Sequence, residues 1–242
     1  MIAIVLAGGY GTRLGEVSKG LPKPLLRVAG RPMIDHIFER ISELDDVRRI
    51  IISTNLRFEE HFRKWLDSEA RMQAEVIADK SYSEQEKPGA IASLTETVSN
   101  IDDDCLILAG DNLFTSSLKP MIQTFKAKSH TVVALYDIKD LELTRHYSTI
   151  TLDPDNRITD LIEKPTNPTT TLIGTCIYAL PKNSLSRMSQ YLSEASDRDN
   201  TGRFIGWLCK REPVYGHILQ GYWWDIGTVD QLNEADRILK RI

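Results

Sequence analysis

Short hydrophobic runs alternate with helical patterns through the first half of the chain. The first run, Ile2 to Leu6, is followed by glycines and is typical of a strand buried on both faces. Further apolar runs of this kind lie at residues 50–52, 74–78, 105–109 and 131–136. Between them, residues 33–44 and 58–70 carry their apolar side chains on one helical face. The alternation predicts an α/β fold with a mainly parallel sheet covered by helices on both faces.

The pattern changes beyond about residue 140. Residues 148–152 and 158–163 alternate between apolar and polar positions around the turn 153–156, which predicts an antiparallel hairpin. A further strand is expected at 172–180, and helices are expected at 183–192, 204–210 and 229–242. No linker rich in Pro, Gly or Ser interrupts the chain, so we expect residues 1–242 to form a single domain with an added substrate lobe.

Composition excludes several classes of function. Hydrophobic residues make up 41% of the chain and charged residues 26%, which is typical of a soluble globular protein. The net charge of -4 and the pI of about 5.8 give no general attraction to nucleic acid or to an anionic membrane surface. Neither is therefore expected as a partner, and any phosphate-binding site must be local.

The three cysteines, Cys105, Cys176 and Cys209, are far apart and lie within or beside apolar runs. We expect buried thiols there, not a disulfide, a metal site or a nucleophile. The apolar start of the chain, Met1 to Leu6, is too short for a signal sequence or a membrane span. A cytoplasmic, reducing environment is the prediction.

The segment from Leu6 to Leu14 is the first candidate for chemistry. It follows a buried strand, and its three glycines in four positions let backbone N–H groups approach an anion without obstruction. A glycine-rich turn can equally be a tight structural bend. Two neighbouring cations favour phosphate binding: Arg13 offers a bidentate donor, and Lys23 lies between two prolines that stiffen its segment.

Two common phosphate motifs do not fit this loop. It lacks the Gly-x-x-x-x-Gly-Lys-Ser/Thr pattern of a P-loop, and Gly9-Tyr-Gly11 lacks the third glycine of a dinucleotide-binding fold. An ordinary ATPase or dehydrogenase is therefore not expected.

The stretch from Leu6 to Met33, LAGGYGTRLGEVSKGLPKPLLRVAGRPM, resembles the signature of the nucleoside-diphosphate-sugar pyrophosphorylases. Among these it is most similar to glucose-1-phosphate thymidylyltransferases, and later segments match in the expected order over essentially the whole chain. The resemblance implies a GT-A-like (Rossmann-like) fold with a mixed sheet, a small antiparallel substrate lobe and an active site at the carboxyl edge of the strands. It also implies a nucleotide-binding half at residues 1–139 and a sugar-phosphate-binding half at residues 140–242.

By this resemblance the chain transfers a nucleotidyl group from a nucleoside triphosphate to a sugar 1-phosphate, releases pyrophosphate and uses Mg²⁺. The base is expected to be thymine or uracil, so that dTTP or UTP is the donor. The catalytic cations would be Arg13 and Lys23. The nucleotide would be bound by the loop and by two later segments, through Leu6, Gly8, Gly9, Gly11, Thr12, Gly89 and Asp111.

Two aspartates are candidates to hold the metal. Asp111 follows the run 105–109, at the end of a strand where ligands of open α/β sheets collect, and its carboxylate suits magnesium. An Asx turn is the alternative role of this residue. Asp225 could instead cap the helix near Val229, but Thr228 is the better-placed cap. The segments around both aspartates resemble the two metal-ligand motifs of the family.

The sugar phosphate has candidates of its own. Glu163-Lys164-Pro165 alone would be an ordinary surface charge pair, but it resembles the Glu-Lys-Pro motif of the family. That resemblance implies that Lys164 binds the sugar phosphate and that Glu163 accepts hydrogen bonds from sugar hydroxyls. Two positions depart from the family: Ser148 replaces the usual glycine, and Gly174 replaces an asparagine that commonly meets the sugar. The identity of the sugar therefore stays open.

Two alternative functions stay open as well. The same fold could act on a non-sugar phosphate such as phosphocholine, which the residues at positions 148 and 174 would permit. The chain could also be a regulatory subunit that binds nucleotide without turnover. The hexapeptide repeats of a β-helix are absent from the sequence, so a common oligomerisation module is missing and assembly into a homo-oligomer is undecided.

Overall fold

The computed structural model describes residues 1–18, 20–68 and 74–242, with the backbone alone for Thr12, Arg13 and Glu16. The chain forms two compact units, each discontinuous in sequence. Unit 1 comprises residues 1–88, 108–118 and 221–242, and unit 2 comprises residues 89–107 and 119–220. The single domain expected from the sequence, with halves that meet at residue 140, stays a prediction.

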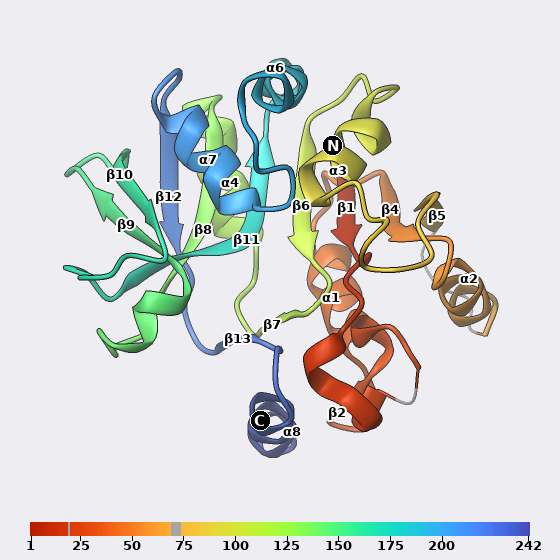
Figure 1. Cartoon of the computed structure of the whole chain (residues 1–242). Coiled ribbons are helices and arrows are strands. Elements are labelled where there is room, and N and C mark those ends of the chain that lie inside the picture. Colours follow the sequence, from red (N-terminus) through yellow and green to blue (C-terminus); the bar gives the residue numbers. More distant parts are fainter. Residues whose placement is uncertain (19, 69–73) are drawn as a thin grey trace. The chain divides into compact units, whose positions relative to one another are not determined.

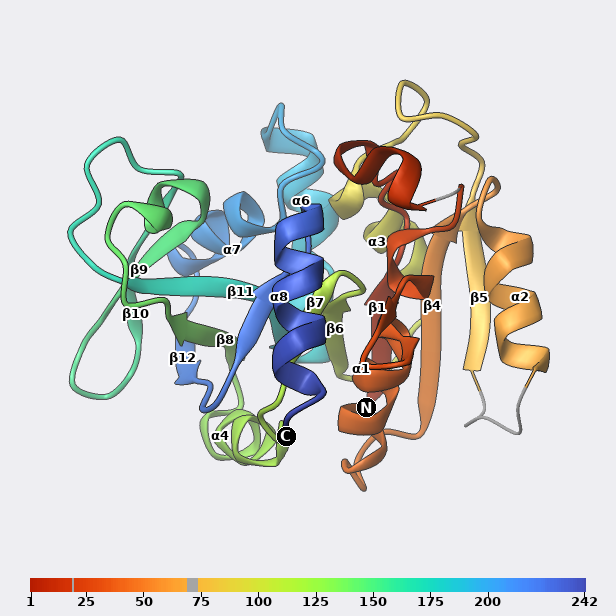
Figure 2. The same cartoon turned by 90° about the horizontal axis from the view of Figure 1, so that it is seen from below.

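Unit 1 is built on three parallel strands, β1 (Ile2–Leu6), β4 (Arg49–Asn55) and β5 (Ala74–Asp79). The last residues of β6 (Cys105–Ala109) follow next to β1, so the strand order is β5-β4-β1-β6. Figures 1 and 2 show β1, β4 and β5 side by side, with α2 (Glu59–Asp67) against β5. The centre of β4, residues 50–52, is fully buried. Strands covered on both faces require unbroken apolar runs, which is why the sequence pattern located β1 and β4.

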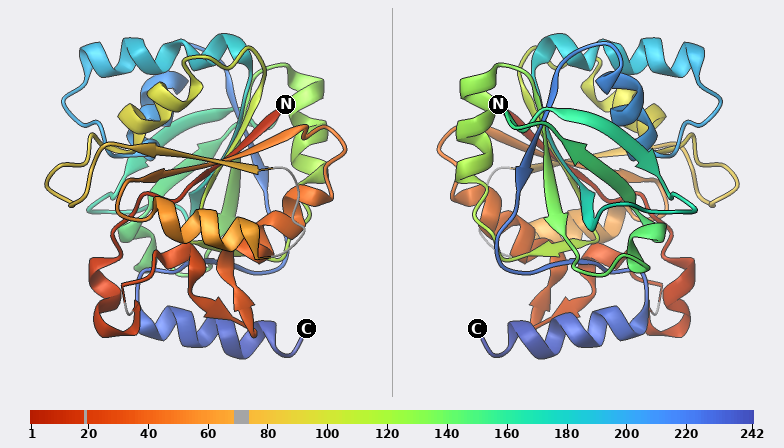
Figure 3. Two further views of the ribbon diagram at one scale, coloured as in Figure 1. Left: turned by 90° about the vertical axis from the view of Figure 1, so that its right-hand side faces the viewer. Right: turned by 90° about the vertical axis from the view of Figure 1, so that its left-hand side faces the viewer.

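A second part of unit 1 is formed by elements that pack against the helix α8 (Val229–Leu239). This helix lies along the hairpin of β2 (Arg27–Val28) and β3 (Arg31–Pro32), as both views of Figure 3 show. The backbone N–H of Ala29 donates to Asp236 Oδ1 at 2.9 Å and ties the hairpin to the helix. The predicted cap is confirmed: Thr228 forms a capping box with Gln231.

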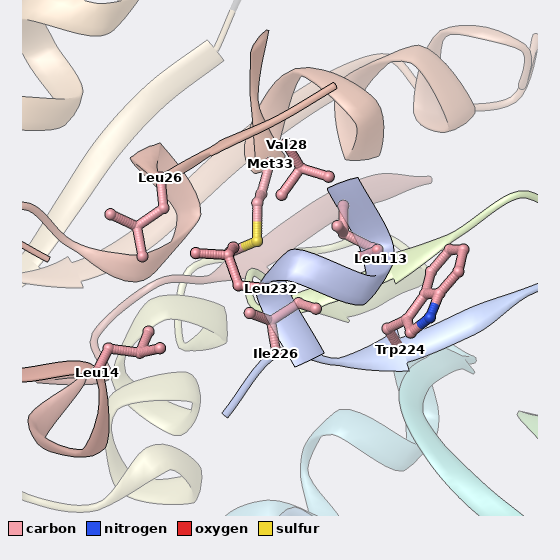
Figure 4. Close-up of a cluster of buried hydrophobic side chains, with 9 residues drawn as sticks. Leu14, Leu26, Val28, Met33, Leu113, Trp224, Ile226 and Leu232 are labelled. Atoms are coloured by element: carbon pink, nitrogen blue, oxygen red, sulfur yellow. The ribbon is translucent and has the colours of Figure 1, made fainter. Parts of the chain in front are cut away.

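A cluster of buried side chains joins α8 to its neighbours. Met33 opens α1 (Met33–Ser42), and Figure 4 shows it with Leu232 of α8 near the middle of the cluster. Trp224 belongs to the short strand β13 (Trp223–Asp225), which pairs antiparallel with β7 (Asn112–Phe114). Burial of this apolar surface fixes the segments that follow β6 and precede α8. The two predicted metal ligands lie in these segments.

Unit 2 holds the antiparallel part of the sheet. Its strands are the beginning of β6, β8 (Thr131–Asp137), β9 (Ser148–Leu152), β10 (Ile158–Glu163), β11 (Leu172–Leu180) and β12 (Val214–Ile218). Strand β11 pairs antiparallel with β8 and β9, β9 pairs antiparallel with β10 as predicted, and β12 runs parallel to β8. The helices of the unit are α3 (Ala90–Val98), α4 (Lys119–Lys128), α5 (Lys182–Leu185), α6 (Arg187–Glu194) and α7 (Thr201–Cys209), of which α7 packs on β10.

The predicted α/β class is confirmed, with a mixed, mainly parallel sheet and helices. Some boundaries differ from the predictions. The helix expected at 183–192 is two helices, α5 and α6, and the helix expected at 204–210 begins three residues earlier, because Asn200 caps it. Helices α3 and α4 and strand β12 were not predicted from the sequence.

The three cysteines are not linked by disulfides; Cys105 is buried as expected, whereas Cys176 and Cys209 are only partly buried. Burial raises the pKa of the Cys105 thiol to about 12, and the nearby Asp103 and Asp104 act in the same direction. A thiol with such a pKa is a poor nucleophile at neutral pH. Over residues 1–18, 20–68 and 74–242, no helix combines the length and the apolar character that crossing a bilayer would need.

Candidate active site

The glycine-rich loop of unit 1 is attached to the end of strand β4. Thr54 Oγ1 donates to the carbonyl of Ala7 at 3.1 Å, and Asn55 Nδ2 donates to the carbonyl of Gly8 at 2.9 Å. The backbone N–H of Ala7 donates in turn to the Ser53 carbonyl. All three residues of β4 are buried, so the loop has a fixed path. These residues were not predicted as part of the site, although the signal was present: three polar residues directly follow an apolar run.

Two glycines of this loop have different structural roles. A Cβ at Gly9 would meet nothing within 4 Å, so its backbone is open to a ligand. Gly11 has a φ of +64°, in the left-handed region, and a Cβ there would lie 3.1 Å from Cγ of Lys23. Gly11 therefore allows the loop to turn over the aliphatic stem of Lys23. Thr12 and Arg13 are predicted site residues, and their side chains lie outside the described part of the structure.

Tyr10 fixes the other side of the loop. Its hydroxyl donates to Ser81 Oγ at 2.9 Å, just beyond β5, and its ring lies 5.7 Å from that of Phe58. The guanidinium of Arg57 lies over both rings, at 5.8 and 5.4 Å from their centroids. No sequence motif indicated this contact between residues so far apart in the chain.

Lys23 and Asp111 form the central charged pair of unit 1. Lys23 Nζ lies 3.0 Å from Oδ2 of Asp111, and the Lys23 side chain is only 11% exposed. Gly110, just before Asp111, leaves no room for a side chain, because a Cβ would lie 2.8 Å from both the Leu6 carbonyl oxygen and Pro24 Cγ. This close packing brings the end of β6 against the loop that follows β1. Two residues predicted to act on one triphosphate are therefore in direct contact.

The predicted metal ligands lie around a shared amide. Asn112 Nδ2 lies 3.4 Å from Asp111 Oδ1 and 3.4 Å from Asp225 Oδ1. Trp223 Nε1 donates to Asn112 Oδ1 at 3.1 Å, which turns the amide nitrogen toward the two carboxylates. The backbone N–H of Ile226 donates to the Asp111 carbonyl and holds the two strands together. Unit 1 thus brings Asp111 and Asp225 together.

This donor set fits magnesium. Mg²⁺ in enzymes of phosphate chemistry is held by one or two carboxylates and completes its shell with water and substrate phosphate. Asp111 and Asp225 would be those ligands. Within the described residues, no group of three or more His, Cys, Asp or Glu side chains gathers where it could share a metal ion.

Unit 2 brings together the residues predicted for the sugar phosphate. Glu163 of β10 pairs with Ser148 of β9, which in turn pairs with Gly174 of β11. Ser148 Oγ donates to Glu163 Oε2, and Asn200 Nδ2 donates to Glu163 Oε1 at 2.7 Å. Lys164 is exposed, and its Nζ lies 4.0 Å from Glu163 Oε1.

Lys164 has an unusual backbone conformation. Its φ is +47°, in the left-handed region that residues with a side chain rarely adopt. The structure around it stabilises this conformation, since its N–H donates to the Tyr147 carbonyl at 3.0 Å. Strained residues of this kind concentrate at functional sites, and the role of the Glu-Lys-Pro motif in binding the sugar phosphate stays a prediction.

Gly89 occupies a position that excludes other residues. Its φ is +99°, and a Cβ there would lie 2.5 Å from the carbonyl oxygen of Arg198. The next two backbone N–H groups donate to Asp199 Oδ1 and to the Arg198 carbonyl, each at 2.9 Å. The geometry therefore explains Gly89 by packing against the segment before α7, and its predicted contact with the nucleotide stays a prediction.

The sequence of the chain matches the model of the nucleotidyl transferase family over residues 2–241, and the chain belongs to this family. This agrees with the resemblance of its glycine-rich loop to the sugar-nucleotide pyrophosphorylases.

Two archaeal proteins are similar to the chain in sequence, each called bifunctional protein GlmU. The one from Methanocaldococcus jannaschii is 29% identical over 241 residues, which are 99% of this chain and 54% of that protein. The one from Methanococcus maripaludis is 30% identical over 248 residues, which are 100% of this chain and 55% of that protein. The chain thus spans about half the length of these curated relatives.

Solved structures show the same fold. A Bacillus anthracis protein assigned as a glucose-1-phosphate thymidylyltransferase, in complex with a sucrose, has a TM-score of 0.86 and 23% identity, over 100% of this chain and 96% of that chain. A UDP-glucose pyrophosphorylase complexed with UDP-glucose has a TM-score of 0.84 and 20% identity, over 99% of this chain and 98% of that chain.

Proposed function

We propose that the chain transfers a nucleotidyl group from a nucleoside triphosphate, dTTP or UTP, to a sugar 1-phosphate and releases pyrophosphate. The observation that carries the proposal is the arrangement in unit 1, where a phosphate-type loop, the ammonium of Lys23 and the two aspartates on either side of Asn112 adjoin one another. Such a set of groups serves a polyphosphate and its metal.

In the proposed reaction an oxygen of the sugar phosphate attacks the α-phosphorus in line with the departing pyrophosphate. The acceptor oxygen is already ionised, so no general base is needed. Lys23 stabilises the charge that develops at the α-phosphate, and Arg13 with the amides of the loop stabilises the pyrophosphate. Asp111 and Asp225 would hold Mg²⁺, which would supply positive charge to the triphosphate.

The residues of unit 2 act on the acceptor in this proposal. Lys164 binds the phosphate of the sugar phosphate, and Glu163 accepts hydrogen bonds from its hydroxyls. Gly174, which pairs with Ser148, belongs to the same sugar-phosphate site in the proposal. Gly89 contributes to nucleotide binding in the proposal, as do Leu6 and the glycines of the loop. A single domain, a cytoplasmic location and the choice of thymine or uracil belong to the same proposal.

One observation favours an alternative acceptor. Ser148 and Gly174, the two departures from the family, are paired on neighbouring strands, so that one place in unit 2 differs from the family twice. The changed residues would permit a non-sugar acceptor such as phosphocholine. A third function would be the binding of nucleotide without turnover.

Pyrophosphate release tests these functions. The four common triphosphates are combined with several sugar 1-phosphates and with phosphocholine, in the presence of Mg²⁺. Turnover with a sugar 1-phosphate supports the proposal, turnover with phosphocholine alone supports the second function, and nucleotide binding without turnover supports the third.

Substitutions then test the assigned roles. Lys23→Ala, Asp111→Asn and Arg13→Ala should each lower the rate on the order of 10²- to 10³-fold. The exposed residues Lys64 and Asp67 of α2 supply matched controls, Lys64→Ala and Asp67→Asn, which should keep the rate of the unsubstituted chain. A folded Lys23 or Asp111 variant with normal turnover would refute the role of that residue.

A further inference from the structure

Glu163 is fixed by two hydrogen bonds that come from different parts of unit 2. Its Oε2 accepts from the hydroxyl of Ser148, on the neighbouring strand, and its Oε1 accepts from the amide of Asn200, before α7. The Glu163 side chain is 14% exposed, so it is mostly enclosed yet open to a ligand. A carboxylate offers about four acceptor positions. Two donors fix its orientation and leave each oxygen with capacity for one ligand hydroxyl.

The Asn200 amide has a defined orientation. Its Oδ1 accepts from the backbone N–H of Arg203 at 2.9 Å and so caps α7. With the oxygen engaged by the helix, the Nδ2 faces Glu163. The cap and the hydrogen bond to Glu163 therefore use opposite ends of one side chain, and a substitution can remove one while it keeps the other.

Gly202 keeps the space around this carboxylate free. A Cβ at Gly202 would lie 2.8 Å from Glu163 Oε2 and would also collide with Ser148 Oγ. Glycine in a helix costs roughly 1 kcal/mol relative to alanine, so helix stability alone does not favour it here. The atoms that a new methyl group would meet are the ends of three movable side chains, because Asn200 Oδ1 also lies 3.2 Å from the Cβ position. Alanine at this position would displace them without disrupting the fold.

We propose that Ser148 and Asn200 are positioning residues for the acceptor: they hold Glu163 in one orientation, in which its carboxylate accepts hydrogen bonds from adjacent hydroxyls of a sugar phosphate. Gly202 leaves the room that this orientation requires. The inference rests on the proposed function, and it adds residues whose effect reaches the acceptor only through Glu163. It accounts for serine at position 148, because a glycine there could not donate to Glu163.

The test compares three variants with a control on the same helix. Asn200→Asp keeps the oxygen that caps α7 but places a second carboxylate against Glu163. Ser148→Ala removes the other donor, and Gly202→Ala displaces the Glu163 carboxylate. The control is Gly206→Ala, also in α7, whose Cβ would meet the Leu161 side chain at 3.2 Å instead.

Calorimetry measures the binding of glucose 1-phosphate, N-acetylglucosamine 1-phosphate and galactose 1-phosphate, and separately of UTP with Mg²⁺. For a sugar phosphate that the unsubstituted chain binds, Asn200→Asp should weaken binding on the order of 10- to 100-fold and the other two variants by roughly tenfold. The affinity for UTP and the melting temperature should stay within error, except that Gly202→Ala should melt at or above the temperature of the unsubstituted chain. Gly206→Ala should bind as the unsubstituted chain does.

Three results would overturn the inference. Unchanged sugar-phosphate binding in Asn200→Asp and Gly202→Ala would show that Glu163 needs no positioning. An equal loss of UTP affinity would show a general structural effect. A failure of the unsubstituted chain to bind any of the three sugar phosphates would remove the acceptor class itself, and this failure of the proposed function is recognised before any substitution is made.

Discussion

The ammonium of Lys23 lies 3.0 Å from a carboxylate oxygen of Asp111, and the Lys23 side chain has only 11% of its surface exposed. In the proposed reaction these groups have different partners: Lys23 contacts phosphate, and Asp111 contacts the metal. Their ion pair must therefore be exchanged when the triphosphate and its metal bind. Each ligand releases one member of the pair, so we expect the metal and the nucleotide to assist one another's binding.

The exchange can be tested without catalysis. Asp111→Asn removes the competitor for Lys23 and a negative charge near the triphosphate, so binding of UTP in EDTA should become roughly fivefold tighter, or about 1 kcal/mol. In the presence of Mg²⁺ the same variant should lose most of the gain in UTP affinity that the metal gives to the unsubstituted chain. Calorimetry with and without Mg²⁺ measures both effects. Weaker binding of UTP in EDTA would contradict the competition.

Asn112 is expected to control the stability of the proposed metal site. Its amide donates to both aspartates and is oriented by Trp223. Asn112→Asp replaces that donor by a third carboxylate, which should lower the free energy of unfolding by about 1–3 kcal/mol at pH 7. Mg²⁺ offsets the repulsion, so it should raise the melting temperature of Asn112→Asp more than that of the unsubstituted chain. An equal rise in both proteins would refute the role.

Replacement of Gly110 and of Gly9 by alanine should have different effects on stability. At Gly110 a methyl group meets the Leu6 carbonyl and Pro24, each at 2.8 Å, so Gly110→Ala should cost about 1–3 kcal/mol of stability. At Gly9 a methyl group meets nothing within 4 Å, so Gly9→Ala should keep the stability but weaken nucleotide binding by obstructing the loop. Urea unfolding and UTP titration separate the two. Equal stability losses would contradict the difference in packing.

Much of the fold could be predicted from the sequence, because buried parallel strands leave a local signal. The runs at Ile2–Leu6 and Cys105–Ala109 were found with their observed bounds, since strands covered on both faces have no polar positions. Helix α3 was missed, because its sequence AIASLTETV is short and mixes apolar with small polar residues. Helix α4 was missed although its signal was present: the buried residues Leu118, Met121, Ile122 and Phe125 have the spacing of one helical face.

Some residues of the candidate site could be predicted and others could not, because a prediction from one sequence depends on local motifs. Lys23, Asp111 and Asp225 belong to local motifs, and the structure brings them together in unit 1. Asn200 belongs to no such motif, and its contact with Glu163 spans 37 positions along the chain. A contact of this kind depends on how α7 packs against β10. Single-sequence patterns carry no information on such packing, so the positioning residues emerged only from the structure.

His36 should make the stability of the chain depend on pH. Its Nε2 lies 2.9 Å from the Val28 carbonyl, and Arg31 lies 3.1 Å from its Nδ1. Burial lowers the pKa of His36 below 6.5, with a further lowering by Arg31, while the Val28 carbonyl and two acidic neighbours act against it. The neutral ring is therefore favoured in the folded chain.

The sign of the pH effect follows from that direction. The contribution of His36 is fully present above pH 6.5, and it is lost as the pH falls from there through the lowered pKa of the folded chain. Urea unfolding between pH 8 and pH 5 should show a smaller loss of stability for His36→Gln than for the unsubstituted chain. His146→Gln, at an exposed position, is the matched control. A parallel loss in His36→Gln and the unsubstituted chain would refute the prediction.

Gly174 offers a test of acceptor choice that leaves the fold intact. A Cβ at this position would lie 3.7 Å from Ile150 and 3.8 Å from Ser148 Cβ, which are ordinary contacts, so the backbone does not require glycine. Gly174→Ala should therefore change the free energy of unfolding by no more than about 1 kcal/mol. The methyl group would lie beside Ser148, on the face of the strands that also carries Glu163.

Gly174→Ala should consequently change the ranking of acceptors more than the handling of nucleotide. We expect kcat/KM to fall most for the sugar phosphate that the unsubstituted chain prefers, while KM for UTP stays unchanged. Gly174→Asn, which restores the residue common in the family, should shift the preference further, because its amide adds both bulk and hydrogen-bonding groups. Steady-state rates of pyrophosphate release across the acceptor panel measure the shift. If all acceptors lose activity by the same factor in both variants, position 174 does not select the acceptor, and the space beside Ser148 has no part in recognition.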